Sequence, residues 1–264
     1  MLILLIIAAA IIFLAAGYVP AVRSYELKSA KIKKPVRFAL ITDLHSCRYG
    51  KNQTRLISLI ESLKIDAVLF AGDIIDDKLP EGRAYKLIQT LEAKMPCFYV
   101  AGNHEYRTRK ADEIKRRLKS MGVTVLQGGC ADVVLNGQRV LIFGVDDPEF
   151  GQNAFETQLG GLKGKDDVYS VLLAHRPEYI DKYLEHNFDL ILSGHAHGGQ
   201  WRLPGLINGL YAPNQGLFPK YAGGLYKFTG TDFIVSRGLA RETTPVPRLF
   251  NRPEIPVIEL KPKF

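Results

Sequence analysis

Cysteine is scarce in this chain, and its pattern argues against two kinds of site. The 264 residues contain three cysteines, Cys47, Cys97 and Cys130, and no CxxC pair. An odd number without paired spacing argues against a disulfide framework and favours a reducing compartment. No serine or cysteine lies in a pattern typical of a covalent nucleophile, so a covalent intermediate is not predicted.

Repeats, low-complexity tracts and basic-aromatic arrays are also missing. The composition, 47% hydrophobic and 23% charged, is that of a globular chain, so disorder is not expected. The net charge is +8, but much of it is local and the rest is dispersed. Nucleic acid is therefore not an expected partner. The sequence does not indicate an oligomeric state.

Charged residues are absent from Leu2 to Val19, a run rich in leucine, isoleucine and alanine. Its 18 residues, rising 1.5 Å each as a helix, span about 27 Å, which is enough for the hydrocarbon core of a bilayer. No basic region precedes the run, as it would in a cleaved signal peptide. The sequence therefore predicts a transmembrane anchor over residues 1–22.

Positive charge follows this apolar run. Residues 23–35 carry five basic side chains against Glu26, a net charge of +4. This pattern indicates a basic linker that faces an anionic membrane surface, although a merely solvated linker has the same composition. The positive-inside rule then predicts a single-pass protein of the cell membrane, with residues 36–264 as a domain on the cytoplasmic side.

Histidine is also rare, and five of the six histidines lie in short polar strings. The strings are Asp43-Leu44-His45, Gly72-Asp73, Gly102-Asn103-His104-Glu105, His175 and Gly194-His195-Ala196-His197. Imidazole, carboxylate and amide oxygen are ligands for divalent metals of borderline and hard character. His186 lies outside every string and is interpreted as a surface residue. The strings together predict one metal site.

Apolar runs precede most of the strings. Runs over 36–42, 67–71, 97–100, 171–173 and 190–192 are typical of strands that are buried on both faces. Helical spacing alternates with strands in the first half of the chain, and the second half is rich in strands. This order predicts an α/β fold, a four-layer α/β/β/α sandwich of two mixed sheets preceded by one transmembrane helix. Ligands gather at the carboxyl ends of such strands, where these strings lie.

In their order along the chain, the strings resemble the pattern of the calcineurin-like metallophosphoesterase superfamily, D-x-H, G-D, G-N-H-[DE], H and G-H-x-H. The resemblance covers about Val36 to Leu260. The runs over 194–200 and 249–255 are similar to its membrane-anchored bacterial branch, which includes enzymes like UDP-2,3-diacylglucosamine pyrophosphatase. Purple acid phosphatases carry a tyrosine where this chain has Asp76, so their iron-tyrosinate centre is not expected.

The resemblance implies two divalent metal ions, with Mn²⁺ favoured and Fe or Zn²⁺ as alternatives. It assigns one ion to Asp43, His45, Asp73 and His197, and the other to Asp73, Asn103, His175 and His195. Asp73 would bridge the two ions. His104 would bind no metal and would act as the catalytic residue, on the phosphoryl group or the leaving oxygen. Glu105, Arg176 and Arg237 are candidates for supporting or phosphate contacts, or for surface ion pairs.

The predicted activity is hydrolysis of a phosphodiester or diphosphate bond by two-metal activation of water. Long loops over 144–167 and 198–232 are candidates for substrate binding. Because the second loop is rich in apolar residues, a lipid or lipid-linked substrate is one prediction, and a strand pair that covers the core is the alternative. A phosphomonoesterase or nuclease on the same centre, or a catalytically silent membrane scaffold, remain rival hypotheses.

Overall fold

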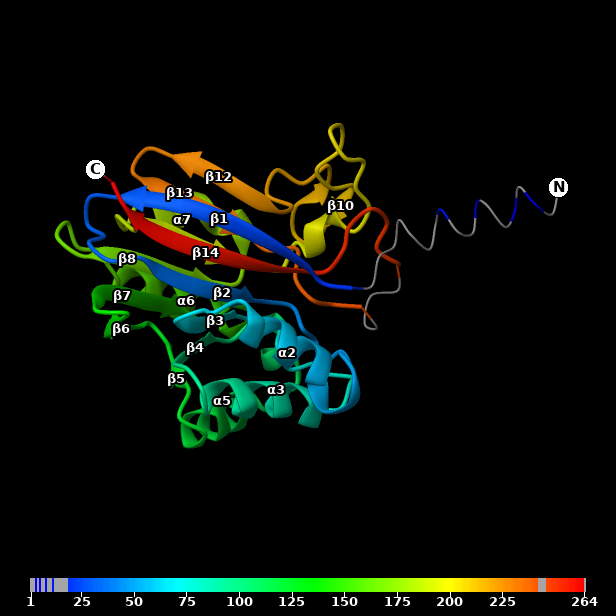
Figure 1. Cartoon of the computed structure of the whole chain (residues 1–264), viewed down its shortest axis with the longest axis horizontal. Coiled ribbons are helices and arrows are strands. Elements are labelled where there is room, and N and C mark those ends of the chain that lie inside the picture. Colours follow the sequence, from blue (N-terminus) through cyan, green and yellow to red (C-terminus); the bar gives the residue numbers. More distant parts are fainter. Residues whose placement is uncertain are drawn as a thin grey trace.

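Two six-stranded sheets form the centre of the computed structural model (Figure 1). It describes residues 19–241 and 246–263, together with Ile3, Leu5, Ala8 and Ile11. The first sheet has the order β1 (Ala21–Ser29), β14 (Glu254–Pro262), β2 (Val36–Ile41), β3 (Ala67–Ala71), β4 (Cys97–Val100) and β5 (Thr124–Val125). The second has the order β12 (Gly224–Phe228), β13 (Thr231–Val235), β9 (Leu190–Ser193), β8 (Tyr169–Ala174), β7 (Gln138–Val145) and β6 (Gly129–Leu135).

Both sheets are mixed, and the strands nearest the predicted site are parallel. In the first sheet β2, β3 and β4 are parallel neighbours, and β14 pairs antiparallel with β2. In the second sheet β7, β8, β9 and β13 are parallel, and β6 and β12 form antiparallel edges. The prediction of a mixed α/β fold with two large sheets is confirmed in these terms.

The helices lie on the outer faces of the two sheets. α2 (Thr54–Ser62), α3 (Gly82–Glu92) and α5 (Ala111–Ser120) share a core with the first sheet. α6 (Gln152–Gly160) and α7 (Ile180–Leu184) share another with the second sheet. A third core joins the facing sides of both sheets. Since the central strands are therefore covered on both faces, they consist of continuous apolar runs rather than alternating patterns.

Shorter elements complete the connections between strands. They are η1 (Lys51–Gln53), α4 (Asn103–Arg107), η2 (Pro148–Phe150), η3 (Pro177–Tyr179), η4 (His197–Gly199), β10 (Tyr211–Ala212) and β11 (Gly216–Leu217). β10 and β11 form a small antiparallel hairpin within the long second loop. The sandwich thus leaves its long connections at one end, where the site residues also lie.

The interpretation of residues 23–35 as a linker is corrected by β1. This strand pairs in parallel with β14 over nine residues, from Ala21 opposite Glu254 to Ser29 opposite Pro262, and the two run side by side in Figure 1. Leu27 is buried in the core between the sheets. Basic side chains on this segment are those of a charged edge strand, which discourages further strand pairing.

The predicted transmembrane helix, and the membrane localisation derived from it, are also corrected. Among the described residues, no helix is long and apolar enough to cross a bilayer. Most of residues 1–22 lie outside the described part of the chain. The hydropathy of a run measures only its transfer preference, and a spanning helix also needs an uninterrupted helical length of about 20 residues.

Candidate metal centre

The polar strings meet because each follows the carboxyl end of a parallel strand. Asp43 follows β2, Asp73 follows β3, Asn103 follows β4, His175 follows β8, and His195 follows β9. The loops are joined by backbone hydrogen bonds, for example from the Asp43 N–H to the Gly72 carbonyl at 3.1 Å. Parallel strands bring their carboxyl ends to the same edge of a sheet. Here those edges of both sheets come together.

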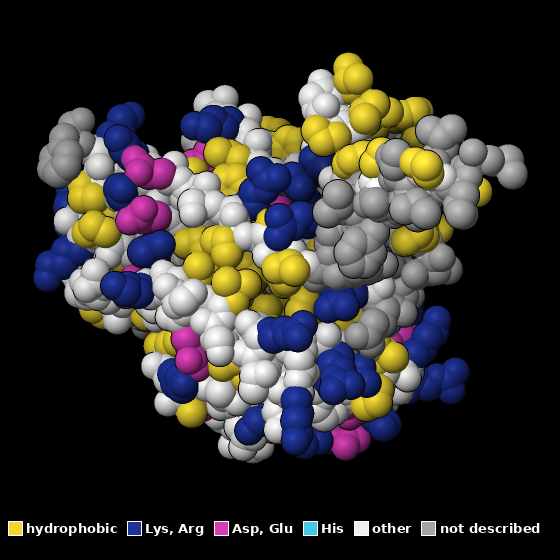
Figure 2. Space-filling view, turned by 45° about the vertical axis from the view of Figure 1, so that its right-hand side comes forward, with side chains coloured by type: hydrophobic (Ala, Val, Ile, Leu, Met, Phe, Trp, Pro, Cys, Tyr) yellow, Lys and Arg dark blue, Asp and Glu magenta, His cyan; other side chains and the backbone are white. Residues whose placement is uncertain are grey.

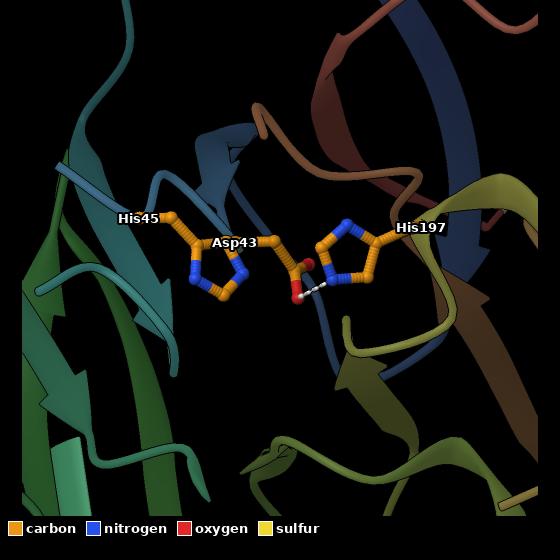
Figure 3. A group of neighbouring side chains, drawn as sticks. All are labelled: Asp43, His45 and His197. Atoms are coloured by element: carbon orange, nitrogen blue, oxygen red, sulfur yellow. Dashed lines mark ion pairs between the residues drawn. The ribbon is translucent and has the colours of Figure 1, made fainter. Parts of the chain in front are cut away.

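One cluster contains Asp43, His45 and His197 (Figure 3), whose ligand atoms lie within 4.8 Å of one another. The Asp43 carboxylate points between the two imidazoles, and its Oδ1 lies 3.6 Å from His197 Nε2. The two rings are stacked at a centroid distance of 5.2 Å. All three side chains are buried, so this group offers an enclosed carboxylate and two imidazoles to a cation.

A second cluster contains Asp73, His175 and His195, also within 4.8 Å. Asp73 Oδ2 lies 3.1 Å from His175 Nε2 and 3.7 Å from His45 Nε2, so this carboxylate stands between the two clusters. The side chain of Asn103 is 2% exposed. Together we call the two clusters, with Asn103, the candidate metal centre.

Buried polar atoms without hydrogen bonds show that the centre suits cations. Five such atoms are His45 Nε2, Asp73 Oδ2, Asn103 Oδ1, His175 Nε2 and His197 Nδ1. Some of these atoms face one another, as Asp73 Oδ2 and His175 Nε2 do at 3.1 Å, but none has a hydrogen bond. A buried polar atom without a hydrogen bond costs about 1–3 kcal/mol. Five of them gathered at one strand edge are the donor set that a divalent ion would satisfy. The residues therefore fit a dinuclear divalent metal site.

Contacts of the Nδ1 atoms orient two of the imidazoles. His175 Nδ1 donates to the Ala71 carbonyl at 2.8 Å, and His45 Nδ1 lies 3.1 Å from Asp76 Oδ1. Each contact leaves Nε2 as the free nitrogen of the ring. Metal-ligating histidines almost always donate the other ring N–H to a carbonyl or carboxylate in this way.

The backbone at the site is strained. Asp43, His45, Asp73, His195 and His197 all have φ between 46° and 64°. This left-handed region costs non-glycine residues of order 1–3 kcal/mol each, and such residues cluster at functional sites. The strain turns successive side chains inward, so it is part of how the loops present the cluster.

Gly72 shows how closely the loops approach. A Cβ atom on this residue would meet His175 Nδ1 at 2.5 Å, and its φ is 84°. A side chain here would therefore displace the imidazole and also strain the backbone. Glycine is therefore required before Asp73, because no room remains beside His175 for a side chain.

The ionisation of the centre in the described structure is set by mutual pairing. Burial alone would raise the pKa of Asp73, but His175 and His45 outweigh it and hold that pKa well below its usual range. Burial alone would lower the pKa of His175, but Asp73 raises it to about 10. Burial, followed by the nearby His175 and Arg176, lowers the pKa of His195 to about 3.

His104 lies beside the centre and is held by two aspartates that the sequence did not single out for this role. Its Nδ1 lies 2.8 Å from Asp77 Oδ1 and 3.4 Å from Asp76 Oδ1, and its backbone N–H donates to Asp73 Oδ1 at 2.8 Å. Burial alone would lower its pKa, but Asp76, Asp73 and Asp77 raise it to about 9. These carboxylates therefore favour the protonated imidazole.

We expect Asp77→Asn to lower the pKa of His104, because the substitution removes one of the carboxylates that favour imidazolium. An NMR titration of the histidine side chains in metal-free protein measures the change. The stabilising effect of this raised pKa is fully present below about pH 6.5 and is lost as the pH rises through about 9. Asp132→Asn, at an exposed pair with Arg139, is the control; an unchanged His104 pKa in Asp77→Asn would contradict the assignment.

Glu105 holds together two of the loops that carry the centre. Its carboxylate accepts backbone N–H groups of Gly102 (2.9 Å), Asp73 (3.0 Å), Ile74 (2.7 Å) and Ile75 (2.9 Å), and it is fully buried. The alternatives left open for Glu105 are therefore decided in favour of a supporting contact. The sequence signal for this residue was its place at the end of the string Gly102-Asn103-His104-Glu105.

Arg176 and Arg237 both form ion pairs rather than facing the centre as free cations. Arg176 is 6% exposed and makes two hydrogen bonds to Asp147, at 2.7 and 2.9 Å. It also donates to Asn214 Oδ1 at 2.8 Å, and that oxygen lies 2.9 Å from His195 Nε2. Asn214 comes from the long second loop and was not predicted, since no motif surrounds it. Arg237 lies 3.2 Å from Glu254.

His186 lies apart from the centre, as expected. It is half-buried rather than fully on the surface, and its Nδ1 lies 2.8 Å from the Leu162 carbonyl. Histidine outside the strings is therefore a structural side chain in this fold.

Comparison with known proteins agrees with this geometry. Residues 36–199 match the family model of the calcineurin-like phosphoesterases. The chain is 32% identical over 213 residues to the uncharacterized metallophosphoesterase YkuE of Bacillus subtilis, covering 79% of this chain and 72% of that protein. It is 29% identical over 236 residues to the phosphodiesterase YaeI of Escherichia coli, covering 86% and 82%.

A third relative is longer than this chain. The uncharacterized metallophosphoesterase of Helicobacter pylori is 30% identical over 257 residues, which cover 92% of this chain. The match spans 65% of the length of that relative. Similarity to it therefore concerns the part that the two chains share.

Proposed function

The chain belongs to the calcineurin-like phosphoesterase family and is a metal-dependent phosphoesterase, and from this premise we propose that it hydrolyses phosphodiester or diphosphate bonds at the candidate metal centre. The observation that carries the proposal is a set of buried ligand atoms without hydrogen bonds, which lie around Asp73. Their chemistry suits a site for two cations better than a packed core, because a core leaves few polar atoms without partners.

In this proposal Asp43, His45 and His197 hold one ion, and Asn103, His175 and His195 hold the other. Asp73 contributes to both, since its carboxylate stands between the clusters. Bound divalent ions supply Lewis acidity toward phosphoryl oxygens and lower the pKa of water toward about 7. Nitrogen and oxygen donors of this kind suit Mn²⁺, Fe or Zn²⁺, and Mn²⁺ is the ion that we propose to test first.

His104 supplies the proton in this proposal. Its imidazole lies against Asp76 and Asp77, which fix the ring and raise the pKa of His104. A proton donated to the leaving oxygen relieves the negative charge that builds up as the P–O bond breaks. General acid catalysis of this kind typically contributes about 10²–10⁴-fold to the rate.

Hydrolysis of a bis-aryl phosphate, a mono-aryl phosphate and single-stranded DNA by the full chain with Mn²⁺ tests the bond class. We expect the diester to be cleaved at the highest kcat/KM, in line with the name of the E. coli relative. Preferential cleavage of the monoester or of DNA would favour the rival phosphomonoesterase or nuclease. No hydrolysis of any of them, with metal bound, would favour a silent scaffold.

Metal removal is expected to destabilise the protein as well as to stop hydrolysis. Ligand present at 100 times its dissociation constant stabilises the folded state by about 2.7 kcal/mol per site. For a domain of this size, that corresponds to a rise in Tm of roughly 5 to 10 °C. Thermal unfolding with EDTA and with Mn²⁺ measures the shift. His45→Ala should reduce it, whereas His186→Ala, outside the centre, should not; equal shifts in both variants would contradict the ligand assignment.

A lipid-linked phosphate ester is the narrower substrate that we propose. Apolar side chains of the long second loop are exposed, among them Leu206 at 81%, Leu217 at 68% and Phe218 at 64%. Other residues of the same loop, such as Ala212 and Tyr221, are buried against the second sheet. The loop thus both covers the core and presents apolar surface, which suits a substrate with a hydrocarbon part.

A further inference from the structure

A basic cavity lies outside the candidate metal centre, where β1, the long second loop and the segment after β13 meet. Its volume is about 440 Å³, and it is lined by Arg23, Arg202, Arg237, Asn208 and apolar residues that include Ile207 and Phe250. This volume is within the range of small-molecule sites. No predicted metal ligand lines it.

The cavity has more positive than negative side chains. Glu254 is buried and lies 3.2 Å from Arg237 Nε and 3.7 Å from Arg23 Nε. Within the described part of the chain, Arg202 pairs with no carboxylate and donates to the Gly198 carbonyl and to Asn208 Oδ1. Three guanidinium groups thus face one carboxylate, which leaves a net charge of +2 for an anion to balance.

The protonation behaviour of Arg202 agrees with this excess of charge. Burial, followed by repulsion from Arg237, lowers the pKa of Arg202 to about 10. A guanidinium remains charged at neutral pH under these conditions. The cavity therefore holds a partly desolvated cation whose charge a bound anion would stabilise.

A smaller apolar pocket shares its wall with the basic cavity. It has a volume of about 200 Å³ and is lined by Trp201, Arg202, Leu203, Ile207, Leu210, Leu249 and Phe250. Arg202, Ile207 and Phe250 belong to both. In Figure 2 hydrophobic side chains gather over the part of the molecule that carries β10, and Lys and Arg side chains lie beside them. Charge and apolar surface are thus adjacent.

We infer that this double pocket binds an anionic amphiphile, with its phosphate-like head among Arg23, Arg202 and Arg237 and its hydrocarbon chain against Trp201. Charge complementarity selects the head, since forked guanidinium groups match the oxygens of such an anion. The shared wall selects a chain attached directly to that head. A free inorganic anion would leave the apolar pocket unused, and a neutral amphiphile would leave the net charge of the cavity unbalanced.

Trp201 makes the binding directly measurable, because it is the single tryptophan of the chain. It is 42% exposed, and its Nε1 donates to the Pro247 carbonyl at 2.9 Å, so its ring is held in place. Decylphosphonate, which contains no ester bond to hydrolyse, is the probe, titrated below its micellar concentration into the full chain. We expect a blue shift and a saturable rise in tryptophan fluorescence as the alkyl chain covers the ring.

Arg202→Gln is expected to weaken this binding about tenfold or more, because it removes the cation shared by both pockets. Arg116→Gln, on α5 and outside both pockets, is the matched control and should bind as the parent does. Thermal unfolding of each variant shows that it is folded. Arg23→Gln, at a half-exposed side chain, is a second variant in case Arg202→Gln fails to fold.

Three outcomes would overturn the inference. If inorganic phosphate displaces the probe with an affinity equal to that of decylphosphonate, the pocket is a site for free anions. Octyl glucoside that binds as tightly as decylphosphonate would indicate a purely apolar pocket. Equal affinities in the parent and the folded arginine variants would place the probe elsewhere. Hydrolysis of the bis-aryl phosphate is measured in the same preparations, so its failure would contradict the proposed function and leave this binding result intact.

Discussion

Asp73→Asn is expected to abolish phosphodiester hydrolysis while the fold survives. The substitution keeps the size of the side chain, and it keeps the oxygen that accepts a hydrogen bond from the backbone N–H of His104. It replaces Oδ2, which lies 3.1 Å from His175 Nε2 and 3.7 Å from His45 Nε2, by an amide NH2 group that cannot act as an anionic ligand. The loss should exceed the roughly 10–100-fold effect typical of residues that only support metal ligands. Steady-state kcat/KM with Mn²⁺ measures it.

Metal content separates this effect from a general loss of structure. We expect Asp73→Asn to retain less than the parent's metal, as measured on the purified protein by elemental analysis, while its circular dichroism is unchanged. Asp132→Asn on the exposed surface is the matched control. Parental activity in Asp73→Asn would show that this carboxylate does not join the two clusters and would remove the basis of the proposed mechanism.

His104→Gln is expected to lower kcat by about 10²–10⁴-fold, the usual contribution of a positioned general acid. Glutamine can still donate a hydrogen bond toward the substrate, but it cannot release a proton. Metal-induced stabilisation should persist, because the proposed ligand set does not include His104. The comparison of kcat with the thermal shift in Mn²⁺ measures both properties in one variant.

The alternative for His104 is that it binds a metal, since its ring also lies within 4.8 Å of ligand atoms of His45 and Asp73. Loss of the thermal shift in His104→Gln would support that alternative and contradict the role of proton donor. A leaving group of low pKa offers a further check: the effect of the substitution should shrink with such a substrate, because its departure needs no proton. An equal loss with all leaving groups would point to a positioning role.

The local sequence predicted the strands around the centre well, for a physical reason. Apolar runs such as residues 38–41 and Ala67–Ala71 are fully buried, and only strands covered on both faces accept such composition. The polar strings interrupt these runs where the chain leaves the sheet. Hence the gathering of aspartate and histidine side chains at one edge of the strands could be predicted without coordinates.

Segments whose role depends on distant partners were not predictable in the same way. β1 has a mixed and basic composition typical of a linker, and it is a strand only because β14, more than 220 residues later, supplies its hydrogen bonds. The predicted transmembrane helix is not found among the described residues, and most of the apolar N-terminal run lies outside them. Asp77 and Asn214 reach the centre from loops without any motif.

The sequence by itself determined the chemistry available to this protein: carboxylate, amide and imidazole groups at the ends of buried strands, which suit divalent metals and phosphoesters. Only the tertiary structure decided how these groups are used. It placed Asp73 between two clusters and set His104 against Asp76 and Asp77, which raise the pKa of its imidazole. It also brought three arginines from separate segments to one cavity beside an apolar pocket. The types of side chain determine which classes of ligand the protein can bind. Distance, burial and charge balance depend on contacts between segments that are far apart in the chain.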